Sequence, residues 1–301
     1  MKCELCWHRC GIDRNRTTGR CGIDNTLHVA HYGLHTGEEP FLTGKNGSGT
    51  IFFAGCTLRC SFCQNHQISR WRNDNTCTGT AALSPAELAD VFFTLKDKGA
   101  SNINLVSPTP YVPGIIEAVQ IARARGFDLP FVYNTHGYDT PETIESLSGI
   151  IDIYLPDFKY GIDRLGEELS RAPGMYSRGK ETLRSIYSQV GNLVLDSSGL
   201  AVKGTAVRHL VLPGNIENSL IILDFLETID KRLHISLMSQ FHPCGDLIRS
   251  HPELNRILSS EEYERVVQYA ESLGFRNLLI QEMDSHESYL PDFRREKVFE
   301  E

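Results

Sequence analysis

The sequence predicts an α/β fold in which parallel strands are joined by crossover helices and preceded by a small cysteine-rich appendage. From about residue 48 onward, short β-branched runs alternate with helical patterns, as a parallel sheet requires. The 301 residues are 41% hydrophobic, enough to fill the core of an enzyme-sized domain. Residues 1–48 are rich in Cys, Gly, His and Arg and lack long apolar runs. We therefore expect a metal-binding segment over residues 1–48, an α/β domain over 49–285 and a tail over 286–301.

The strands are expected where β-branched and aromatic residues form short runs bounded by turn residues. These runs cover residues 50–54, 102–106, 130–134, 152–155, 207–212, 235–238 and 277–280. Two further β-rich runs flank the turn DSSG, from Asp196 to Gly199, and predict a hairpin inserted before a core strand.

Helix boundaries are marked by capping residues. Ser84, Pro85 and Glu87 form a capping-box pattern, and the apolar stripe that follows ends before Gly99. A second start is marked by Thr140, and two later apolar faces begin at residues 222 and 263. We expect these apolar stripes to pack against the sheet rather than to bind a cofactor.

The charge pattern argues against nucleic-acid and membrane partners. The formal charge is −8, from 30 basic and 38 acidic residues, without long runs of like charge. The first residues, MKCELCWHRC, have no apolar core of a secretory signal, and no apolar run is long enough to span a membrane. We expect a cytoplasmic protein.

The nine cysteines indicate metal binding, because cytosolic thiols are kept reduced and clustered spacings are typical of metal sites. Seven of them cluster: Cys3, Cys6, Cys10 and Cys21 form one group, and Cys56, Cys60 and Cys63 form the other. Cys77 and Cys244 stand apart, and we expect each to fill space in the core.

Three thiolates leave one position open in a site that normally takes four. Structural zinc is closed by four ligands, and a cubane [4Fe–4S] cluster normally binds four cysteines. His66 follows Cys63 by three residues, so it could serve only as a crowded fourth ligand. The spacing C-x3-C-x2-C therefore favours an iron–sulfur cluster with one open iron over zinc, which stays possible.

The stretch GCTLRCSFCQN, from Gly55, resembles the signature of the radical S-adenosylmethionine superfamily. The resemblance implies a partial (βα)6-type radical SAM barrel in which S-adenosylmethionine chelates the open iron of the cluster. It also implies that Phe62, the aromatic residue before the last cysteine, lies by the adenine.

Further motifs are similar to one branch of that superfamily, the uncharacterised branch related to pyruvate formate-lyase activating enzyme. They are FVYNTHGY from Phe131, DIYLPDFKY from Asp152, VRHLVLPGN from Val207 and SLMSQFHP from Ser236. Polar residues at the strand ends are expected to meet in one site, as in a parallel barrel. The resemblance implies these S-adenosylmethionine-binding residues: Phe62, Ser107, Thr109, Asn134, Thr135, Asp157, Lys159, Arg208, Ser239 and Gln240.

One segment departs from the superfamily pattern. The Gly-Gly-Glu type segment that often holds the methionine amino group is replaced by SPTP, Ser107 to Pro110, which has no carboxylate. Backbone carbonyls or the Thr109 hydroxyl would have to accept that hydrogen bond. For Asp157 and Lys159 the alternative to a ligand role is a simple surface ion pair.

The implied activity is that of a radical SAM oxidoreductase, with no catalytic residue required beyond the cluster ligands. A reduced [4Fe–4S] cluster cleaves S-adenosylmethionine, and the 5′-deoxyadenosyl radical abstracts hydrogen from a substrate. The substrate expected first is a glycine of a glycyl radical enzyme, while another protein, a peptide or a small molecule stays open. The electron donor is expected to be flavodoxin or ferredoxin. Two alternatives are a zinc-binding interaction module and a non-radical metallohydrolase that uses Cys56, Cys60 or Cys63 with His66 around a catalytic metal.

The four amino-terminal cysteines provide enough thiolates for a closed tetrahedral zinc site or for a second iron–sulfur cluster. The run CELCWHRCGIDRNRTTGRCG is similar to the amino terminus of the same uncharacterised branch. We favour a structural metal, because so short and polar a segment could hardly fold without one. His8 is expected to face solvent rather than to bind this metal.

Overall fold

A computed structural model describes residues 2–70, 80–244, 247–285, 291–295 and 298 of the chain. Its strands belong to a single ten-stranded sheet. They are β1 (Leu27–His35), β2 (Ser48–Phe53), β3 (Ala81–Leu83), β4 (Ile103–Val106), β5 (Phe131–Thr135), β6 (Ile153–Pro156), β7 (Val194–Leu195), β8 (Ala201–Leu210), β9 (His234–Met238) and β10 (Asn277–Ile280).

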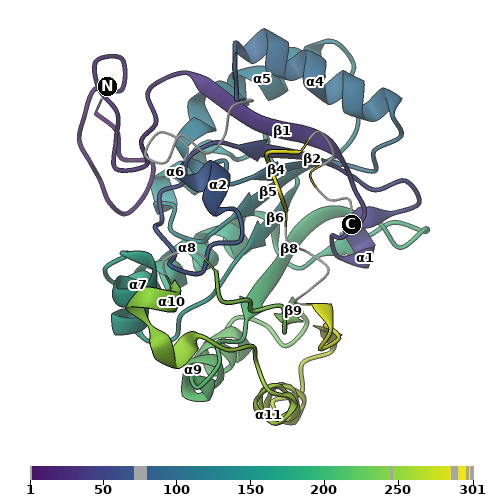
Figure 1. The fold of residues 1–301 in the computed structure, drawn as a ribbon. Helices are drawn as coiled ribbons and strands as arrows, with labels where there is room; N and C mark the ends of the chain where they lie inside the picture. Colours follow the sequence, from purple (N-terminus) through teal and green to yellow (C-terminus); the bar gives the residue numbers. More distant parts are fainter. Residues whose placement is uncertain (1, 71–79, 245–246, 286–290, 296–297, 299–301) are drawn as a thin grey trace.

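The sheet is mostly parallel and follows the order β10-β9-β8-β6-β5-β4-β2-β1-β3 (Figure 1). Neighbouring strands from β2 to β10 run parallel, while β1 and β3 extend the sheet beyond β2 as antiparallel strands. The expected α/β fold is confirmed, and each of the expected parallel strands is present. The antiparallel strand β1 was not expected, because its residues lie in the segment interpreted as a loop-rich appendage.

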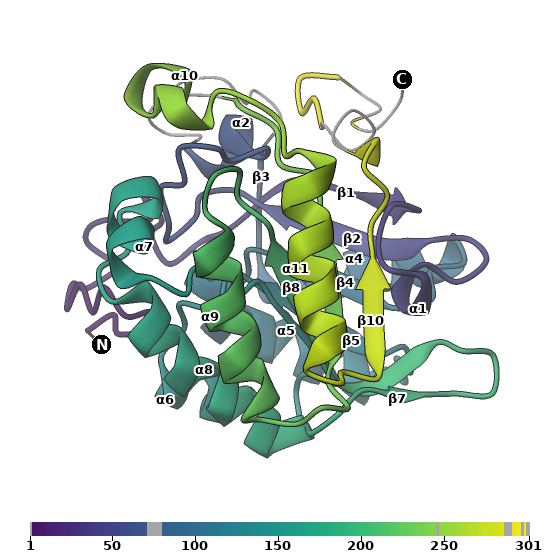
Figure 2. The ribbon, with the colours of Figure 1, turned by 90° about the horizontal axis from the view of Figure 1, so that it is seen from below.

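Helices connect the strands and cover the outer face of the sheet (Figure 2). They are α1 (Pro40–Thr43), α2 (His66–Ser69), α4 (Pro85–Asp97), α5 (Val112–Ala124), α6 (Pro141–Ser146), α7 (Asp163–Ser170), α8 (Met175–Val190), α9 (Ile216–Glu227), α10 (Leu247–Ser250) and α11 (Ser260–Ser272), with short 3-10 turns at Thr109–Tyr111 and Pro252–Leu254.

The helix starts follow the capping residues in the sequence. Ser84 Oγ accepts a hydrogen bond from the Glu87 amide at 3.3 Å, and the Glu87 carboxylate accepts one from the Ser84 amide at 2.7 Å. Both halves of the expected capping box are thus present at the start of α4. The Thr140 hydroxyl likewise caps α6.

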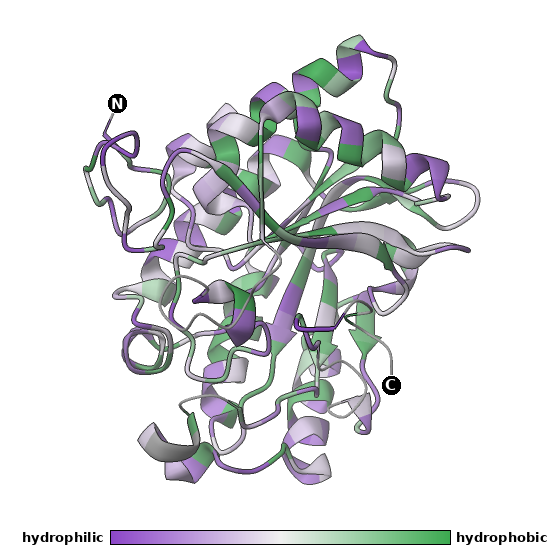
Figure 3. Cartoon of the chain, turned by 45° about the horizontal axis from the view of Figure 1, so that its top comes forward, coloured by the Kyte–Doolittle hydropathy of each residue, from purple (hydrophilic) through white to green (hydrophobic). Residues whose placement is uncertain are grey.

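Alternate residues of each parallel strand face opposite sides of the sheet. On β5 the outer residues Phe131 and Tyr133 pack with α4 and α5, whereas Val132 points inward with Leu155 of β6 and Phe41 of α1. Figure 3 shows the central strands largely in the green of hydrophobic residues, with mixed colours along the surrounding helices. The short helix α1 therefore fills the inner side of the sheet at one end.

The expected hairpin is present, but its second arm and the core strand are one continuous strand, β8. Strand β7 pairs antiparallel with the first part of β8, and Asp196 donates its amide hydrogen to Leu200 O at 2.8 Å. In β8, Gly204 has a φ of +115° and lies so close to the Asn192 carbonyl that a Cβ atom would sit 2.2 Å from its oxygen. No helix among the described residues is long and apolar enough to cross a membrane.

Candidate active site

A cavity of about 500 Å³ opens at the carboxyl ends of the parallel strands. The segments that line it follow β2, β4, β5, β6, β9 and β10, and the last part of β8 contributes as well. Cys56, Cys60 and Cys63 lie on one wall of this cavity. The topology of a parallel sheet thus brings residues from distant parts of the chain to one edge.

Most of the residues that the sequence indicated for S-adenosylmethionine line this cavity. They are Phe62, Ser107, Asn134, Thr135, Asp157, Lys159, Arg208 and Gln240. Thr109 and Ser239 do not line it. Thr109 donates its hydroxyl hydrogen to Asp139 Oδ1 at 2.7 Å, and Ser239 donates its own to Glu282 O at 2.7 Å. Because both hydroxyls bond within the fold, neither is directed at a ligand in the cavity.

The three cavity thiols sit in an environment that disfavours free thiolates. Burial raises the pKa of Cys56 well above its usual range, with further contributions from the charges of Cys60 and Cys63. Burial likewise raises the pKa of Cys60 to about 11, although the Ser170 hydroxyl lies 2.9 Å from its sulfur. Burial also raises the pKa of Cys63. A cationic metal centre would offset these effects, because it stabilises the thiolate form directly.

The donor set fits an iron–sulfur cluster better than a single metal ion. Among the described residues, no three His, Cys, Asp or Glu side chains converge closely enough to hold one ion. A cubane cluster spreads its thiolate ligands over different iron atoms, so it does not require convergence on one point. The wall formed by Cys56, Cys60 and Cys63 therefore fits a [4Fe–4S] cluster with one open iron.

Cys244 lies nearer to this wall than its position in the sequence suggested. Burial raises its pKa to about 12, and the charges of Cys63 and Cys60 contribute to the rise. The sequence analysis treated Cys244 as an isolated core residue. Cys77, the other cysteine treated this way, lies outside the described residues.

Asp157 and Lys159 follow β6 and form an ion pair with each other. Their side chains are only 22% and 13% exposed, and both line the cavity. This placement differs from that of a solvated surface pair. A charged ligand group in the cavity could exchange with either partner of the pair.

The segment SPTP carries local backbone strain beside the cavity. Ser107 adopts a φ of +57°, in the left-handed region that non-glycine residues rarely occupy, and donates its amide hydrogen to Asn134 O at 3.0 Å. This hydrogen bond to β5 holds the Ser107 backbone conformation in place. Ser107 therefore faces the cavity from a fixed position at the end of β4.

Several cavity residues were missed by the sequence analysis, among them His136 and Gln281. His136, within FVYNTHGY, has its Nε2 atom 2.6 Å from Thr57 Oγ1, and burial lowers its pKa. Gln281, directly after β10, donates to Gln240 Oε1 at 2.8 Å and accepts from the Ser239 amide at 2.9 Å. The polar residue after each strand was the signal that could have identified them.

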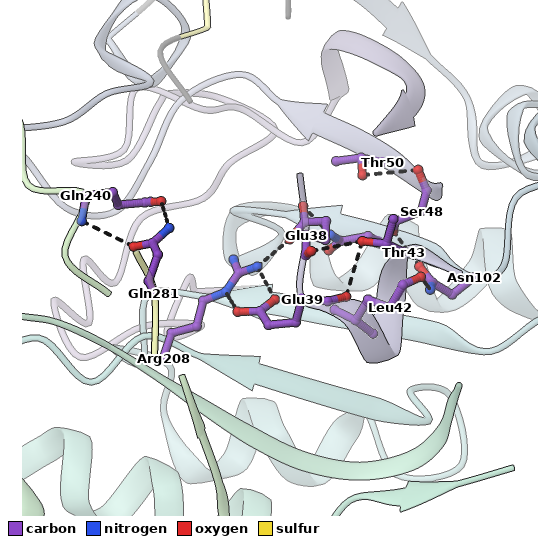
Figure 4. Close-up of polar contacts among 11 residues, drawn as sticks. Glu38, Glu39, Leu42, Thr43, Ser48, Thr50, Asn102, Arg208, Gln240 and Gln281 are labelled. Carbon is purple, nitrogen blue, oxygen red and sulfur yellow. Dashed lines mark hydrogen bonds and ion pairs between the residues drawn. The ribbon is translucent and has the colours of Figure 1, made fainter. Parts of the chain in front are cut away.

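The largest omission is a pair of glutamates from the amino-terminal segment (Figure 4). Arg208 donates from Nε and Nη2 to the Glu39 carboxylate at 2.7 and 2.6 Å, and Nη2 also contacts Glu38. Asn104 donates to the other Glu38 oxygen at 2.8 Å. Although burial alone would lower the pKa of Arg208, Glu39 and Glu38 raise it well above its usual value. Both glutamates line the cavity, so residues before β2 complete its inner wall.

Comparison with known proteins identifies the family. The sequence profile of the Radical SAM superfamily matches residues 50–183, which include the cavity cysteines. The chain is also 30% identical over 275 residues to "Uncharacterized protein MJ0674" of Methanocaldococcus jannaschii, covering 89% of this chain and 74% of that protein. The chain belongs to the radical SAM superfamily. Membership implies a [4Fe–4S] cluster and S-adenosylmethionine as cofactors.

Further relatives agree with this assignment. The lipoyl synthase of Parabacteroides distasonis is 24% identical over 249 residues, covering 78% of this chain and 77% of that protein. A solved structure of TYW1 with a lysine-pyruvate adduct bound has a TM-score of 0.50 at 17% identity, covering 79% of this chain and 78% of that one. This likeness concerns the fold. The alternatives of a zinc-binding interaction module and a non-radical metallohydrolase are not favoured.

Proposed function

We propose that this radical SAM enzyme holds its cluster on Cys56, Cys60 and Cys63 and abstracts hydrogen from a protein or peptide substrate. The proposal is carried by one observation: the three thiols share a cavity with the polar ends of the parallel strands. The residues we assign to S-adenosylmethionine are those strand-end residues that line this cavity.

The cofactors supply the bond cleavage, and the chain's own residues supply position and the exclusion of water. Phe62 is buried and packs against Phe241 with their ring centroids 5.5 Å apart, which provides an apolar wall for an adenine ring. Asp157 and Lys159 offer an acceptor and a donor for the polar groups of S-adenosylmethionine. None of these roles requires a side chain to act as an acid or a base.

For the substrate, we infer a glycine in a partner protein. The five motifs shared with the activating-enzyme branch, from GCTLRCSFCQN to SLMSQFHP, support this inference. It implies direct hydrogen transfer from the glycine Cα to the 5′ carbon of the adenosyl group. This substrate inference is more specific than membership of the superfamily, because the chain is also similar to lipoyl synthase.

The cysteine assignment is tested with anaerobically purified protein, chemical reductant and S-adenosylmethionine. Replacement of Cys56, Cys60 and Cys63 together by alanine should abolish formation of 5′-deoxyadenosine and remove about four iron atoms per chain. Cys77→Ala, which removes a thiol outside both groups, should leave both quantities unchanged. Full cleavage by the triple variant would contradict the assignment.

The substrate inference needs a separate measurement. A candidate partner protein labelled with deuterium at the glycine Cα should pass deuterium to 5′-deoxyadenosine. If the glycine-labelled protein passes no deuterium while samples labelled at other residues do, the abstracted hydrogen does not come from glycine. That result would leave the cysteine assignment unaffected.

A further inference from the structure

The four amino-terminal cysteines come together although they span residues 3–21. The sulfur atoms of Cys21 and Cys10 lie 3.4 and 3.9 Å from the position that a Cβ atom would take at Gly19. The charges of Cys10 and Cys21 both act on Cys6, and the charge of Cys3 acts on Cys21. All four are free thiols. The four thiols therefore lie in one neighbourhood of the amino-terminal segment without being joined as disulfides.

The turns that present these thiols are held by backbone hydrogen bonds. Cys3 donates its amide hydrogen to Ile12 O at 2.8 Å, and Gly11 donates to Cys3 O at 3.0 Å. A second turn is closed by Gly22, which donates to Gly19 O at 2.9 Å and has a φ of +78°. The cysteine-bearing backbone is thus ordered in the absence of any extended apolar core of its own.

The arrangement of the thiols favours an iron–sulfur cluster over zinc. Zinc requires its sulfur ligands at about 2.3 Å from a single point. Within the part of the chain that the structure describes, no three potential ligands converge in this way. The same finding applies to Cys56, Cys60 and Cys63, whose cofactor in this superfamily is a [4Fe–4S] cluster. Neither group therefore presents its thiols around a single point, as one zinc ion would require, whereas a cluster spreads its ligands over several iron atoms.

The amino-terminal group lies directly against the loop that carries the cavity cysteines. A Cβ atom at Gly55 would sit 3.0 Å from the Cys21 carbonyl oxygen, and Gly55 precedes Cys56. Arg59 donates to Arg20 O at 3.0 Å. A close approach at Gly55 and a side-chain hydrogen bond from Arg59 therefore join the two cysteine-bearing segments.

A second contact runs through His8, and the expectation that His8 faces solvent is wrong. Its Nε2 atom lies 3.0 Å from Thr57 O, next to Cys56, and burial lowers its pKa to about 4. Trp7 packs against the apolar cluster that also includes Cys56 and Cys60. His8 thus contacts the loop that carries the cavity cysteines, and Trp7 packs against the same apolar cluster as Cys56 and Cys60.

The amino-terminal segment has a small excess of basic side chains on an acidic protein. Residues 1–25 contain five basic and three acidic side chains, of which Arg14 is buried and Arg9 and Arg16 pair with carboxylates, whereas the whole chain has a charge of −8. Arg16 is 86% exposed on its side chain, and exposed Arg20 bonds to the carbonyl of exposed Arg171 at 3.1 Å. Figure 1 shows this segment projecting from the body of the molecule. Such a patch attracts an acidic protein by electrostatic steering.

We propose that Cys3, Cys6, Cys10 and Cys21 hold a second iron–sulfur cluster that relays electrons to the cavity from an acidic one-electron donor protein. This inference rests on the proposed function of the cavity. One electron leaves the donor, which is oxidised, and it is consumed in the reductive cleavage of one S–C bond of S-adenosylmethionine. Because the exposed Arg16 and Arg20 side chains lie beside the amino-terminal cysteines in the chain, this group is the entry point for a protein donor.

The test compares two reductants on the anaerobically purified enzyme: reduced flavodoxin, which is acidic, and dithionite, which is small. Wild type should contain about eight iron atoms per chain and little zinc. Replacement of Cys6 and Cys10 together by alanine should remove about half of the iron and one of two spectroscopic cluster signals. Cleavage of S-adenosylmethionine should fall at least about tenfold with flavodoxin while changing less than about twofold with dithionite.

A second variant keeps every cysteine in place, so it remains informative if the first fails to fold. Charge reversal of Arg16 and Arg20 to glutamate should leave the iron content unchanged and should slow only the flavodoxin-driven reaction. Arg265→Glu, on the exposed face of α11 and remote from this surface, is the matched control. One zinc per chain in wild type, or equal rate losses with both reductants, would overturn the proposal. Absence of cleavage by wild type with dithionite would instead count against the cavity assignment.

Discussion

At the scale of single residues, the placement of Lys159 supports the ligand role that we propose for it. Its ammonium group lies in the cavity beside the Asp157 carboxylate, and only 13% of its side chain is exposed. An ammonium group has three donors, so its pair with Asp157 leaves donors for a ligand in the cavity. The neighbouring side chains on the strand ends complete the same surface.

We expect Lys159→Ala and Asp157→Asn to lower the affinity for S-adenosylmethionine while leaving the iron content unchanged. One hydrogen bond to a charged group contributes about 1.5–3 kcal/mol, which corresponds to roughly ten- to hundredfold in the dissociation constant. Anaerobic equilibrium dialysis with labelled S-adenosylmethionine provides the measurement. Lys96→Ala removes a cation from an exposed pair, in which Nζ lies 2.6 Å from Asp128, and serves as control. Equal affinities in all variants would return Lys159 to a structural role.

The strand-end residues were predictable because they directly follow buried strands, whose carboxyl ends meet at one edge of the sheet. Thr109 followed the same rule, yet its hydroxyl is bonded to the buried carboxylate of Asp139. Position after a strand therefore indicates which residues come near the cavity. It does not indicate which way a side chain points, because that depends on partners from other strands.

At the scale of elements, the segment from β1 to β2 supplies part of the cavity wall. Phe41 of α1 packs among inner residues of the sheet, and this anchors Glu39 beside Arg208. Glu39 is 8% exposed, so its charge depends on the guanidinium for compensation. The amino-terminal segment is thus joined to the sheet by apolar packing and by a buried ion pair.

We expect Arg208→Ala to lower the free energy of unfolding by about 3–5 kcal/mol, because it leaves the Glu38 and Glu39 carboxylates without their cation. Glu39→Ala should cost less, because Arg208 keeps its contact with Glu38. The double variant should lose much less than the sum of the two single losses. Anaerobic urea denaturation measures all three. Glu168→Ala breaks the exposed pair with Arg164, whose side chain is 73% exposed, and should change stability far less. Strictly additive losses would show that Glu39 and Arg208 act independently.

The segment from β1 to β2 also shows what a local sequence pattern cannot predict. The parallel strands were predictable because each is a β-branched run between helical patterns. Strand β1, with the sequence LHVAHYGLH, mixes polar and apolar residues and joins the sheet by pairing with β2 and β3. The pairing of Glu39 with Arg208 links residues 169 positions apart. No local signal records such a contact, since it arises only when the sheet has formed.

At the scale of the whole molecule, buried histidines link different parts of the fold to pH. His209 of β8 is fully buried, with Nδ1 2.8 Å from Phe158 O and Nε2 2.8 Å from Ser219 Oγ. A neutral ring satisfies both contacts by donating to the carbonyl and accepting from the hydroxyl. Burial lowers its pKa to about 4, and burial also lowers the pKa values of His8 and His136. The native state therefore holds these rings neutral where an unfolded chain would protonate them.

This arrangement should make the protein less stable as the pH falls below about 6.5. An unfolded histidine binds its proton near pH 6.5, whereas His209 in the folded chain does so near pH 4, so stability is lost as pH falls between these values. For His209 alone, the loss between pH 7 and pH 5 should be about 2 kcal/mol. His209→Gln cannot titrate, so the difference in unfolding free energy between wild type and this variant should narrow by that amount at pH 5. Ser219→Ala removes a hydrogen-bond partner but keeps the titrating ring. The difference in unfolding free energy between wild type and this variant should therefore change far less between pH 7 and pH 5. Urea denaturation of anaerobic samples at pH 7 and pH 5 measures these unfolding free energies. If the unfolding free energies of wild type and His209→Gln fall in parallel with pH, this ring is not the source of the acid sensitivity.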